Sequence, residues 1–390
     1  MPSPAVPQTV KGLSLVSLFN DFASEMVYPL LPAFVVGTLG GGALILGLLD
    51  GAADLTSAVL KVVSGRLADR AGWRKPLILV GYATAVLVRP LIAVAGAAWQ
   101  VVGFRVVDRV GKGIRTPPRD ALIAAVSTPE ARGRAFGFHR AADHFGAVVG
   151  SLAAWYLLTR GAEVRSVIGW SVVPGVLAFL LLAVVLRGAR AAGIESSPGS
   201  RVADASGRVF WVPVLALTAL TLFRLPETLL LLRLQQQGVA VAAVPLVWAG
   251  LHVVRSASSY PGGWLSDRLG PRLTVAAGGV VFAAVVAALS VKLSPAGAIA
   301  VFLVLGLVAG LTEGAERALV ARLAPVRTGR GFGVYHALTG IAALPAGLAF
   351  GALYQDLGPH PALLASAAGV VVSVIAWMAV TVTRAGEVTA

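Results

Sequence analysis

The chain has 390 residues, of which 57% are hydrophobic and only 13% are charged. A typical soluble domain has about 25% charged residues, so this composition excludes an ordinary soluble protein and, more firmly, a disordered chain. The formal net charge is +14, which makes the location of the basic residues important. Cysteine is absent, which excludes disulfides, thiolate metal sites and cysteine nucleophiles.

Apolar stretches long enough to cross a bilayer, at about 20 residues per crossing, recur along the whole sequence. They predict an all-α membrane protein with twelve transmembrane helices. The expected spans are 13–36, 44–64, 77–98, 100–125, 135–158, 166–186, 210–232, 241–264, 273–291, 296–320, 331–353 and 361–383. The stretch 100–125 carries several charges, and we include it because an even number of spans keeps the loop charges on consistent sides. The first apolar run contains Asp21 and Glu25, so we expect it to insert without cleavage.

The basic residues outside these spans are distributed unequally between the two sides. Loops on the side of the termini hold clusters such as Arg66, Arg70, Arg74 and Lys75. The opposite loops hold only Arg160, Arg165, Arg233 and Lys292. By the positive-inside rule, both termini are expected in the cytoplasm, in a multi-pass protein of the plasma or inner membrane. The basicity then reflects topology and a lipid partner, and we predict no nucleic-acid partner.

Two sequence motifs occur twice, at nearly the same separation. The run GRLADRAGWR begins at Gly65 after the second span, and GWLSDRLGPR begins at Gly263 after the eighth. GRAFG at 133–137 and GRGFG at 329–333 open the fifth and eleventh spans. The duplication predicts two pseudo-symmetric six-helix bundles, 1–187 and 210–390, joined by a cytoplasmic linker at 188–209. Such a pair builds its pathway within one chain, so we expect a monomer.

The first repeated motif has a physical interpretation as a conformational loop. Its glycines allow sharp turns and close helix approach, whereas its aspartates cap helices or bind arginine. The residues concerned are Gly65, Asp69, Arg70 and Arg74 in the first copy, and Gly263, Asp267 and Arg268 in the second.

With twelve spans, a central linker and this loop motif in both halves, the chain resembles the major facilitator superfamily, and specifically its exporter-like bacterial members. The resemblance implies a solute carrier that works by alternating access, with spans 1, 4, 7 and 10 lining the cavity. Arg109 and Gly113 match the family's R-x-x-x-G element, whose arginine often takes part in proton coupling. Gly137, Gly146 and Gly150 partly match the exporter-associated glycine motif, although Ser151 replaces its proline.

Charged residues inside the spans are candidates for substrate binding and proton coupling, because a charge at bilayer depth costs at least about 2.5 kcal/mol. Helical spacing groups several of them: His139 with Asp143, Arg105 with Asp108, and Arg224 with Glu227. We also predict that Asp21 or Glu25 pairs with a base of the fourth span. The candidates are Asp21, Glu25, Arg105, Asp108, Arg109, His139, Arg140, Asp143, Arg224, Glu227, Glu313, Glu316, Arg317 and His336.

The energy source is expected to be the proton gradient, and no other cofactor is expected. A buried carboxylate can carry the proton, and we favour Asp21 and Glu25. No Walker loop occurs, which argues against ATP. Pro29, Pro32 and Pro226 are expected to kink or break their helices, as is Pro345.

The favoured function is proton-coupled export of a small organic compound by antiport. A carrier of a divalent metal ion, with His139, Asp143, His144 and His336 as ligands, is one alternative. A carrier of an organic anion, using the intramembrane arginines, is another. A membrane-embedded enzyme is remote, because neither H-E-x-x-H nor G-x-S-x-G occurs.

Replacement of Arg109 with alanine is expected to abolish transport at normal expression. Alanine has no positive charge that could favour release of the proton from a nearby carboxyl group. Uptake and efflux assays in cells that express matched amounts of both proteins test this. Unchanged transport would contradict the coupling role.

Overall fold

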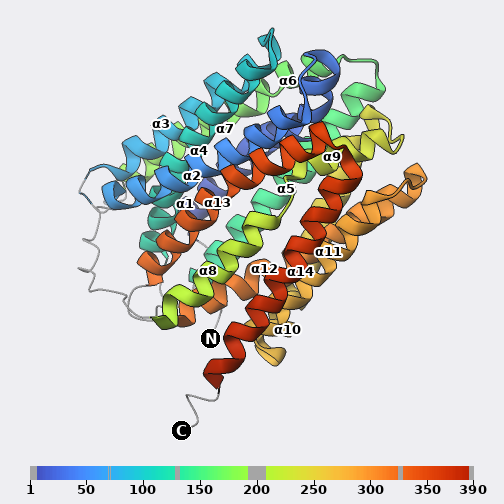
Figure 1. Ribbon diagram of the computed structural model, residues 1–390. Helices are drawn as coiled ribbons and strands as arrows, with labels where there is room; N and C mark the ends of the chain where they lie inside the picture. The colour runs from blue at the N-terminus through green and yellow to red at the C-terminus, as the bar shows by residue number, and fades with distance from the viewer. Residues whose placement is uncertain are drawn as a thin grey trace. The chain divides into compact units, whose positions relative to one another are not determined.

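The computed structural model describes residues 7–68, 70, 72–127, 132–191, 208–323 and 328–385, and in this part of the chain every regular element is a helix (Figure 1). A helix or an interrupted helix lies at each of the twelve predicted spans, so the all-α prediction is confirmed. Nine of these segments are long and apolar enough to cross a membrane. The exceptions are the first, fourth and fifth spans, whose charged residues lower their mean hydropathy.

Contacts divide the chain into two compact units, Met1–Gly40 with Thr56–Ser200 and Gly41–Leu55 with Arg201–Ala390. The helix α2 (Ala43–Ala68) therefore contributes its first part to the second unit and its second part to the first unit. Most of the predicted linker lies outside the described residues, since 192–207 are not among them. The division into 1–187 and 210–390 stays a prediction.

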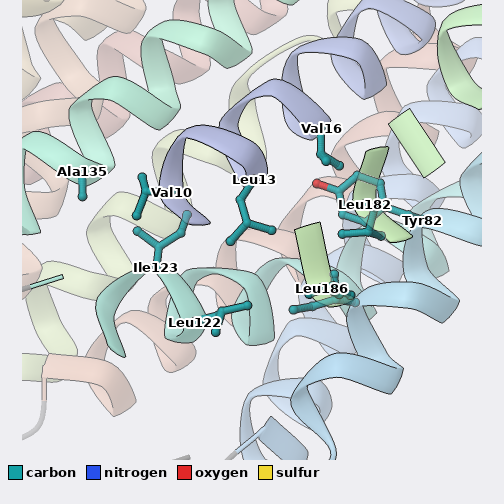
Figure 2. Packing of buried hydrophobic residues seen from close by; sticks show 10 residues of the cluster. Val10, Leu13, Val16, Tyr82, Leu122, Ile123, Ala135, Leu182 and Leu186 are labelled. Carbon is teal, nitrogen blue, oxygen red and sulfur yellow. The ribbon is translucent and has the colours of Figure 1, made fainter. Parts of the chain in front are cut away.

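In the first unit, long helices pack side by side around a shared apolar core. Its elements are α1 (Gln8–Val27), η1 (Tyr28–Leu30), η2 (Ala33–Thr38), the second part of α2, α3 (Arg74–Val88), η3 (Arg89–Val94), α4 (Ala98–Val126), α5 (Arg132–Thr159), α6 (Val164–Trp170) and α7 (Val172–Ala191). The helix α1 packs along α5 and α7, and α3 packs on α4. Figure 2 shows one apolar cluster, in which Leu13 of α1, Ile123 of α4 and Leu182 of α7 are fully buried.

The second unit consists of the first part of α2 and the later helices. They are α8 (Arg208–Phe223), α9 (Glu227–Gln236), η5 (Val241–Ala243), α10 (Val244–Leu269), α11 (Pro271–Ser290), α12 (Pro295–Leu323), α13 (Thr328–Asp356) and α14 (Pro359–Ala385). The helices α10 and α11 pack on α12, and α14 packs on α11 and α8. Gly47 of α2 lies so close to Gly347 of α13 that neither position has space for a Cβ atom.

Three of the four predicted proline effects are visible as interruptions. The helix α1 ends at Val27, and a 3-10 turn with Pro29 and a π-helical turn after Pro32 follow it. Pro226 precedes the first residue of α9 and separates it from α8. Because proline has no N–H and its ring clashes with the preceding turn, these positions interrupt the α-helical hydrogen bonds. In contrast, α13 continues through Pro345 without a break.

Near its end, each copy of the repeated loop motif has a glycine with a positive φ angle. Gly72 in the first copy has φ +84°, and Gly270 in the second has φ +82°. Side chains rarely tolerate this left-handed region, so both copies need glycine at the same turn. Arg74 donates from Nε to the Ala68 carbonyl oxygen at 2.9 Å, which gives the last carbonyl of α2 a hydrogen-bond donor. Asp69 and the side chain of Asp267 lie outside the described residues.

Gly146 and Gly150 of α5 bring this helix against the backbone of α1. A Cβ atom on Gly146 would overlap the Leu18 carbonyl, and one on Gly150 would overlap the Phe22 carbonyl. Small residues at such crossings allow helices to pack closely in lipid. Gly137, on the same helix, has open space around its Cβ position.

Gly146→Ala should therefore destabilise the protein, by about 1–3 kcal/mol for an overpacked contact. Gly137→Ala is the matched control and should be neutral or stabilising, because alanine favours helix over glycine by about 1 kcal/mol. Thermal unfolding of both purified variants in detergent measures the difference. Equal unfolding temperatures for the two would contradict the close α1–α5 contact.

Candidate functional site

A carboxylate in the first unit is buried among guanidinium groups. Arg89 donates from Nη2 and Nε to Oδ1 of Asp108, at 2.9 and 3.3 Å. The Nη1 atoms of Arg105 and Arg109 lie 3.5 and 3.8 Å from Oδ2 of Asp108. The side chains of Asp108 and Arg105 are 1% exposed. Both carboxylate oxygens thus face positive charge in a region from which solvent is nearly excluded.

Local sequence explains how these groups meet. Arg105, Asp108 and Arg109 occupy neighbouring positions on one face of α4, as their spacing predicts. Arg89 reaches them from the start of η3, at the end of α3. Close contact between Gly81 of α3 and Gly111 of α4, where a Cβ atom on either would lie 2.6 Å from the other's carbonyl oxygen, brings these two helices together.

One of the arginines that surround Asp108 also contacts an aromatic ring. The guanidinium carbon of Arg105 lies 5.0 Å from the centre of the Tyr28 ring, at the point where α1 is interrupted. A cation over an aromatic face is stabilised by the ring quadrupole, by about 2 kcal/mol or more where water is excluded. The interruption of α1 therefore places an aromatic ring beside the charged cluster.

A hydrogen-bonded chain connects this cluster to α1. Arg89 donates from Nη1 to the Asn20 carbonyl oxygen at 3.0 Å and from Nη2 to Asn20 Oδ1 at 3.3 Å. Asn20 in turn donates from Nδ2 to Asp21 Oδ1 at 3.0 Å. The amide of Asn20 has one end on Arg89 and the other on Asp21, so a change in the charge of Asp21 reaches Arg89 through a single side chain.

Asp21 or Glu25 is predicted to pair with a base of the fourth span. The structure places Asp108 against Arg105 and Arg109, and it links Asp21 to Arg89 through Asn20. A direct pair between the first and fourth spans stays a prediction. Arg89 and Asn20 were not among the predicted residues. Arg89 is the only charge in the predicted span 77–98, and that isolation was the available signal.

The polar residues of α5 form a second group in the first unit. His139 Nε2 lies 3.7 Å from Asp143 Oδ1, as the predicted i, i+4 spacing requires. Arg140 Nη1 lies 3.6 Å from Asp143 Oδ2. Ser14 of α1 lies with its Oγ atom 3.4 Å from His139 Nδ1. The predicted pair on α5 therefore exists and contacts α1.

Two ion pairs among the described residues of the second unit correct a prediction. Arg224 Nη2 lies 3.8 Å from Glu316 Oε1, and Glu227 pairs with Arg255. The spacing-based pair between Arg224 and Glu227 is wrong, because the chain is not helical between them. Pro226 interrupts the helix there, so the i, i+3 geometry is lost. Tyr335 donates its hydroxyl to Glu316 Oε2 at 2.5 Å.

The remaining predicted site residues lie in or next to α2, α10, α12 and α13. Glu313 is exposed on α12, and His336 is half-buried on α13 with its ring 5.2 Å from that of Tyr335. The side chain of Arg317 lies outside the described residues. Gly65 and Arg70 lie at and just after the end of α2, and the guanidinium carbon of Arg268 lies 4.0 Å from the centre of the Trp264 ring. Within the described ranges, no group of three or more histidines or acids could hold a metal ion.

Comparison with known proteins gives one family match and two relatives that cover different shares of the chain. A sequence model described as Major Facilitator Superfamily matches residues 13–342 and 229–389. An uncharacterized MFS-type transporter of Methanocaldococcus jannaschii is 28% identical over 358 residues, or 88% of this chain and 87% of that protein. Multidrug resistance protein MdtH of Edwardsiella ictaluri is 33% identical over 133 residues, or 34% of this chain and 33% of that protein.

A likeness of fold extends to solved structures. The crystal structure of nucleoside transporter NupG has a TM-score of 0.76 and 10% sequence identity, and the match covers 96% of this chain and 99% of that chain. At this identity the match concerns the fold alone.

Asp108→Asn should strongly destabilise the first unit, because three guanidinium groups would then face each other without a shared carboxylate. Removal of one partner from a buried ion pair costs about 3–5 kcal/mol. Asp120→Asn is the control: Asp120 is paired with Arg119 at 3.0 Å, but its side chain is 36% exposed. That loss should be about 0–1 kcal/mol.

The apparent unfolding temperature of each purified variant measures this difference. If Asp108→Asn unfolded at the temperature of the Asp120→Asn control, the buried cluster would not have the stabilising role assigned to it.

Proposed function

The chain belongs to the major facilitator superfamily, and on this premise we propose that it is a proton-coupled secondary transporter that exports a small organic compound by alternating access. As a member of this family it is a multi-pass membrane transporter of small molecules and not an enzyme. Proton coupling, the direction of transport and the class of compound are the parts that we propose.

The observation that carries the proposal is the chain of hydrogen bonds from Asp21 through Asn20 and Arg89 to Asp108. An ionised carboxylate only accepts hydrogen bonds, whereas a protonated one also donates. Protonation of Asp21 therefore weakens its charge-assisted contact with the Asn20 amide. The hydrogen bond that Asn20 accepts from Arg89 changes as a result. Arg89 is bound to the buried Asp108, so the proton on Asp21 alters the electrostatic balance of α4.

Export is supported by two features. Part of the chain is similar to a protein named for multidrug resistance. Gly146 and Gly150 belong to the partial exporter-associated motif. They allow α5 to pack closely against α1, beside the residues proposed to carry the proton. Because their backbones are in contact, α1 and α5 cannot change position independently of each other.

The proposed setting is the inner membrane, with both termini in the cytoplasm and one chain as the functional unit. The excess of basic residues in the loops on the side of the termini supports this orientation. The duplicated motifs support a monomer, because each chain supplies both halves.

An organic anion is the second candidate substrate, and the surplus of positive charge around Asp108 favours it over a metal ion. Three arginines approach a single carboxylate there. A divalent metal carrier has less support, because the described residues do not bring the required ligands together.

A screen followed by a flux assay tests the proposal. Metals, organic acids and drug-like cations are first ranked by the rise in unfolding temperature that each produces. The strongest binder is then added to proteoliposomes that contain a pH-sensitive dye and carry an imposed proton gradient. We expect this compound to accelerate collapse of the gradient.

Asp21→Asn should abolish the compound-dependent proton flux, because an amide cannot take up the proton. Asp356→Asn, at the exposed end of α13, is the control and should behave as the parent. Compound flux that is independent of the gradient, or unchanged coupling in Asp21→Asn, would contradict proton transport through this carboxylate.

A further inference from the structure

The break between α8 and α9 leaves backbone groups that need hydrogen-bond partners. Pro226 stands directly before the first residue of α9, where the side chain of an N-cap residue usually accepts a hydrogen bond from the backbone, and proline has no group that can do so. In lipid such a backbone N–H finds no acceptor, so the protein itself must supply one. The partners of these groups therefore show which elements hold the break in place.

The helix α14 holds the side of the break that belongs to α8. Leu225 donates its backbone N–H to Ser366 Oγ at 3.2 Å, and Ser366 donates its hydroxyl to the Phe223 carbonyl oxygen at 2.7 Å. Ser366 is fully buried. A single hydroxyl thus binds both the last residue of α8 and the chain that follows it.

A carboxylate of α2 holds the start of α9. Thr228, the second residue of α9, donates its backbone N–H to Asp50 Oδ2 at 3.1 Å and its hydroxyl to the same oxygen at 2.8 Å. Thr228 is fully buried. An N-cap aspartate accepts its hydrogen bond from the second or third residue of its own helix. Asp50 takes this role from a different helix, and its negative charge also favours the positive end of the α9 dipole.

Glycine contacts fix the part of α2 that carries Asp50. A Cβ atom on Gly47 would overlap the Gly347 carbonyl of α13, and one on Gly51 would lie 2.8 Å from another α13 carbonyl oxygen. Such backbone contacts hold two helices rigidly together. Asp50 lies between the two glycines, so its backbone has little freedom to move relative to α13.

Two charged residues flank the break, and each pairs with a different helix. Arg224 Nη2 lies 3.8 Å from Glu316 Oε1 of α12. Glu227, the first residue of α9, pairs with Arg255 of α10. Because only two residues separate Arg224 from Glu227, the direction in which α9 starts determines where both side chains point.

We propose that Asp50 is a positioning residue for substrate binding: its carboxylate caps α9 and so fixes Arg224 and Glu227 in the geometry that a substrate meets. This inference rests on the proposed function, with these two residues as part of its substrate site. The helix that supplies the cap belongs to the first unit from Thr56 onwards. A displacement of α2 from α9 therefore withdraws the cap and loosens the first turn of α9, and with it the substrate site.

Hydrogen–deuterium exchange on the purified full chain tests the cap without a substrate, because amides exchange faster where a helix opens more often. Asp50→Ala should accelerate exchange at the start of α9 by at least about fivefold, the effect of losing a helix cap of ordinary strength. Asp50→Asn keeps an acceptor oxygen but loses the charge, so its exchange should lie between the two. Asp54→Ala is the matched control, because Asp54 is exposed one turn further along α2, and it should behave as the parent.

Thr228 variants test the same contact from the other side. Thr228→Ser keeps both donors and should exchange as the parent does. Thr228→Val has nearly the shape of threonine but no hydroxyl, so it should accelerate exchange at the start of α9. Parent-like exchange in Asp50→Ala, or in Thr228→Val where Asp50→Ala does not fold, would overturn the cap.

Transport kinetics test the positioning role. In the proteoliposome assay with the compound that the screen selects, Asp50→Ala should raise KM by at least about fivefold and change kcat less, because only molecules with an ordered α9 bind well. Asp50→Asn should recover part of the loss, and Asp54→Ala should have the parent KM. Faster exchange in Asp50→Ala with an unchanged KM would overturn the positioning role.

These measurements separate the inference from the function on which it rests. If the parent showed no compound-dependent flux, the proposed function would be wrong and the positioning role with it, while the exchange rates would still decide whether Asp50 caps α9. If the parent transported the compound and Asp50→Ala had the same KM, only the positioning role would be wrong.

Discussion

The packing of the helices in the first unit depends on the pairing of buried charged side chains. Asp108 and Arg105 are almost completely shielded from solvent, and a charge in that position is tolerated only with close partners. Arg89 supplies the shortest contact and comes from a different helix, so the ion pair joins α3 and η3 to α4. Its remaining hydrogen bonds reach α1 at Asn20. One arginine thereby connects three segments that are separated in sequence.

Glycine contacts make this pairing geometrically possible. Gly81 and Gly111 allow α3 and α4 to approach at their backbones, and Gly146 allows α5 to approach α1. In the second unit, Gly310 of α12 packs against Ser258 of α10 without space for a Cβ atom. Close packing through small residues is a property of helices in lipid, where hydrophobic burial contributes little to association. The charged groups are consequently held by rigid helix contacts.

The helical spans and their interruptions could be predicted because they depend on local sequence. Hydropathy locates the spans, and proline favours an interruption, as at Pro226. Proline alone does not decide the outcome, because α13 continues through Pro345. His139 and Asp143 meet because both lie on one helix. The link from Arg89 to Asn20 could not be predicted, since it depends on the relative rotation of α1 and α3, which spacing within one helix does not specify. The predicted pair of Arg224 and Glu227 is wrong because helical spacing does not hold across an interrupted helix.

Asp108, Arg89 and Asn20 act as one network rather than as separate contacts. A double-mutant cycle on the free energy of unfolding, with Asp108→Asn and Asn20→Ala, tests it most directly. These residues both bind Arg89, and members of one network typically show coupling energies of about 0.5–3 kcal/mol. We expect a coupling energy in that range. Additive effects of the two substitutions would contradict it.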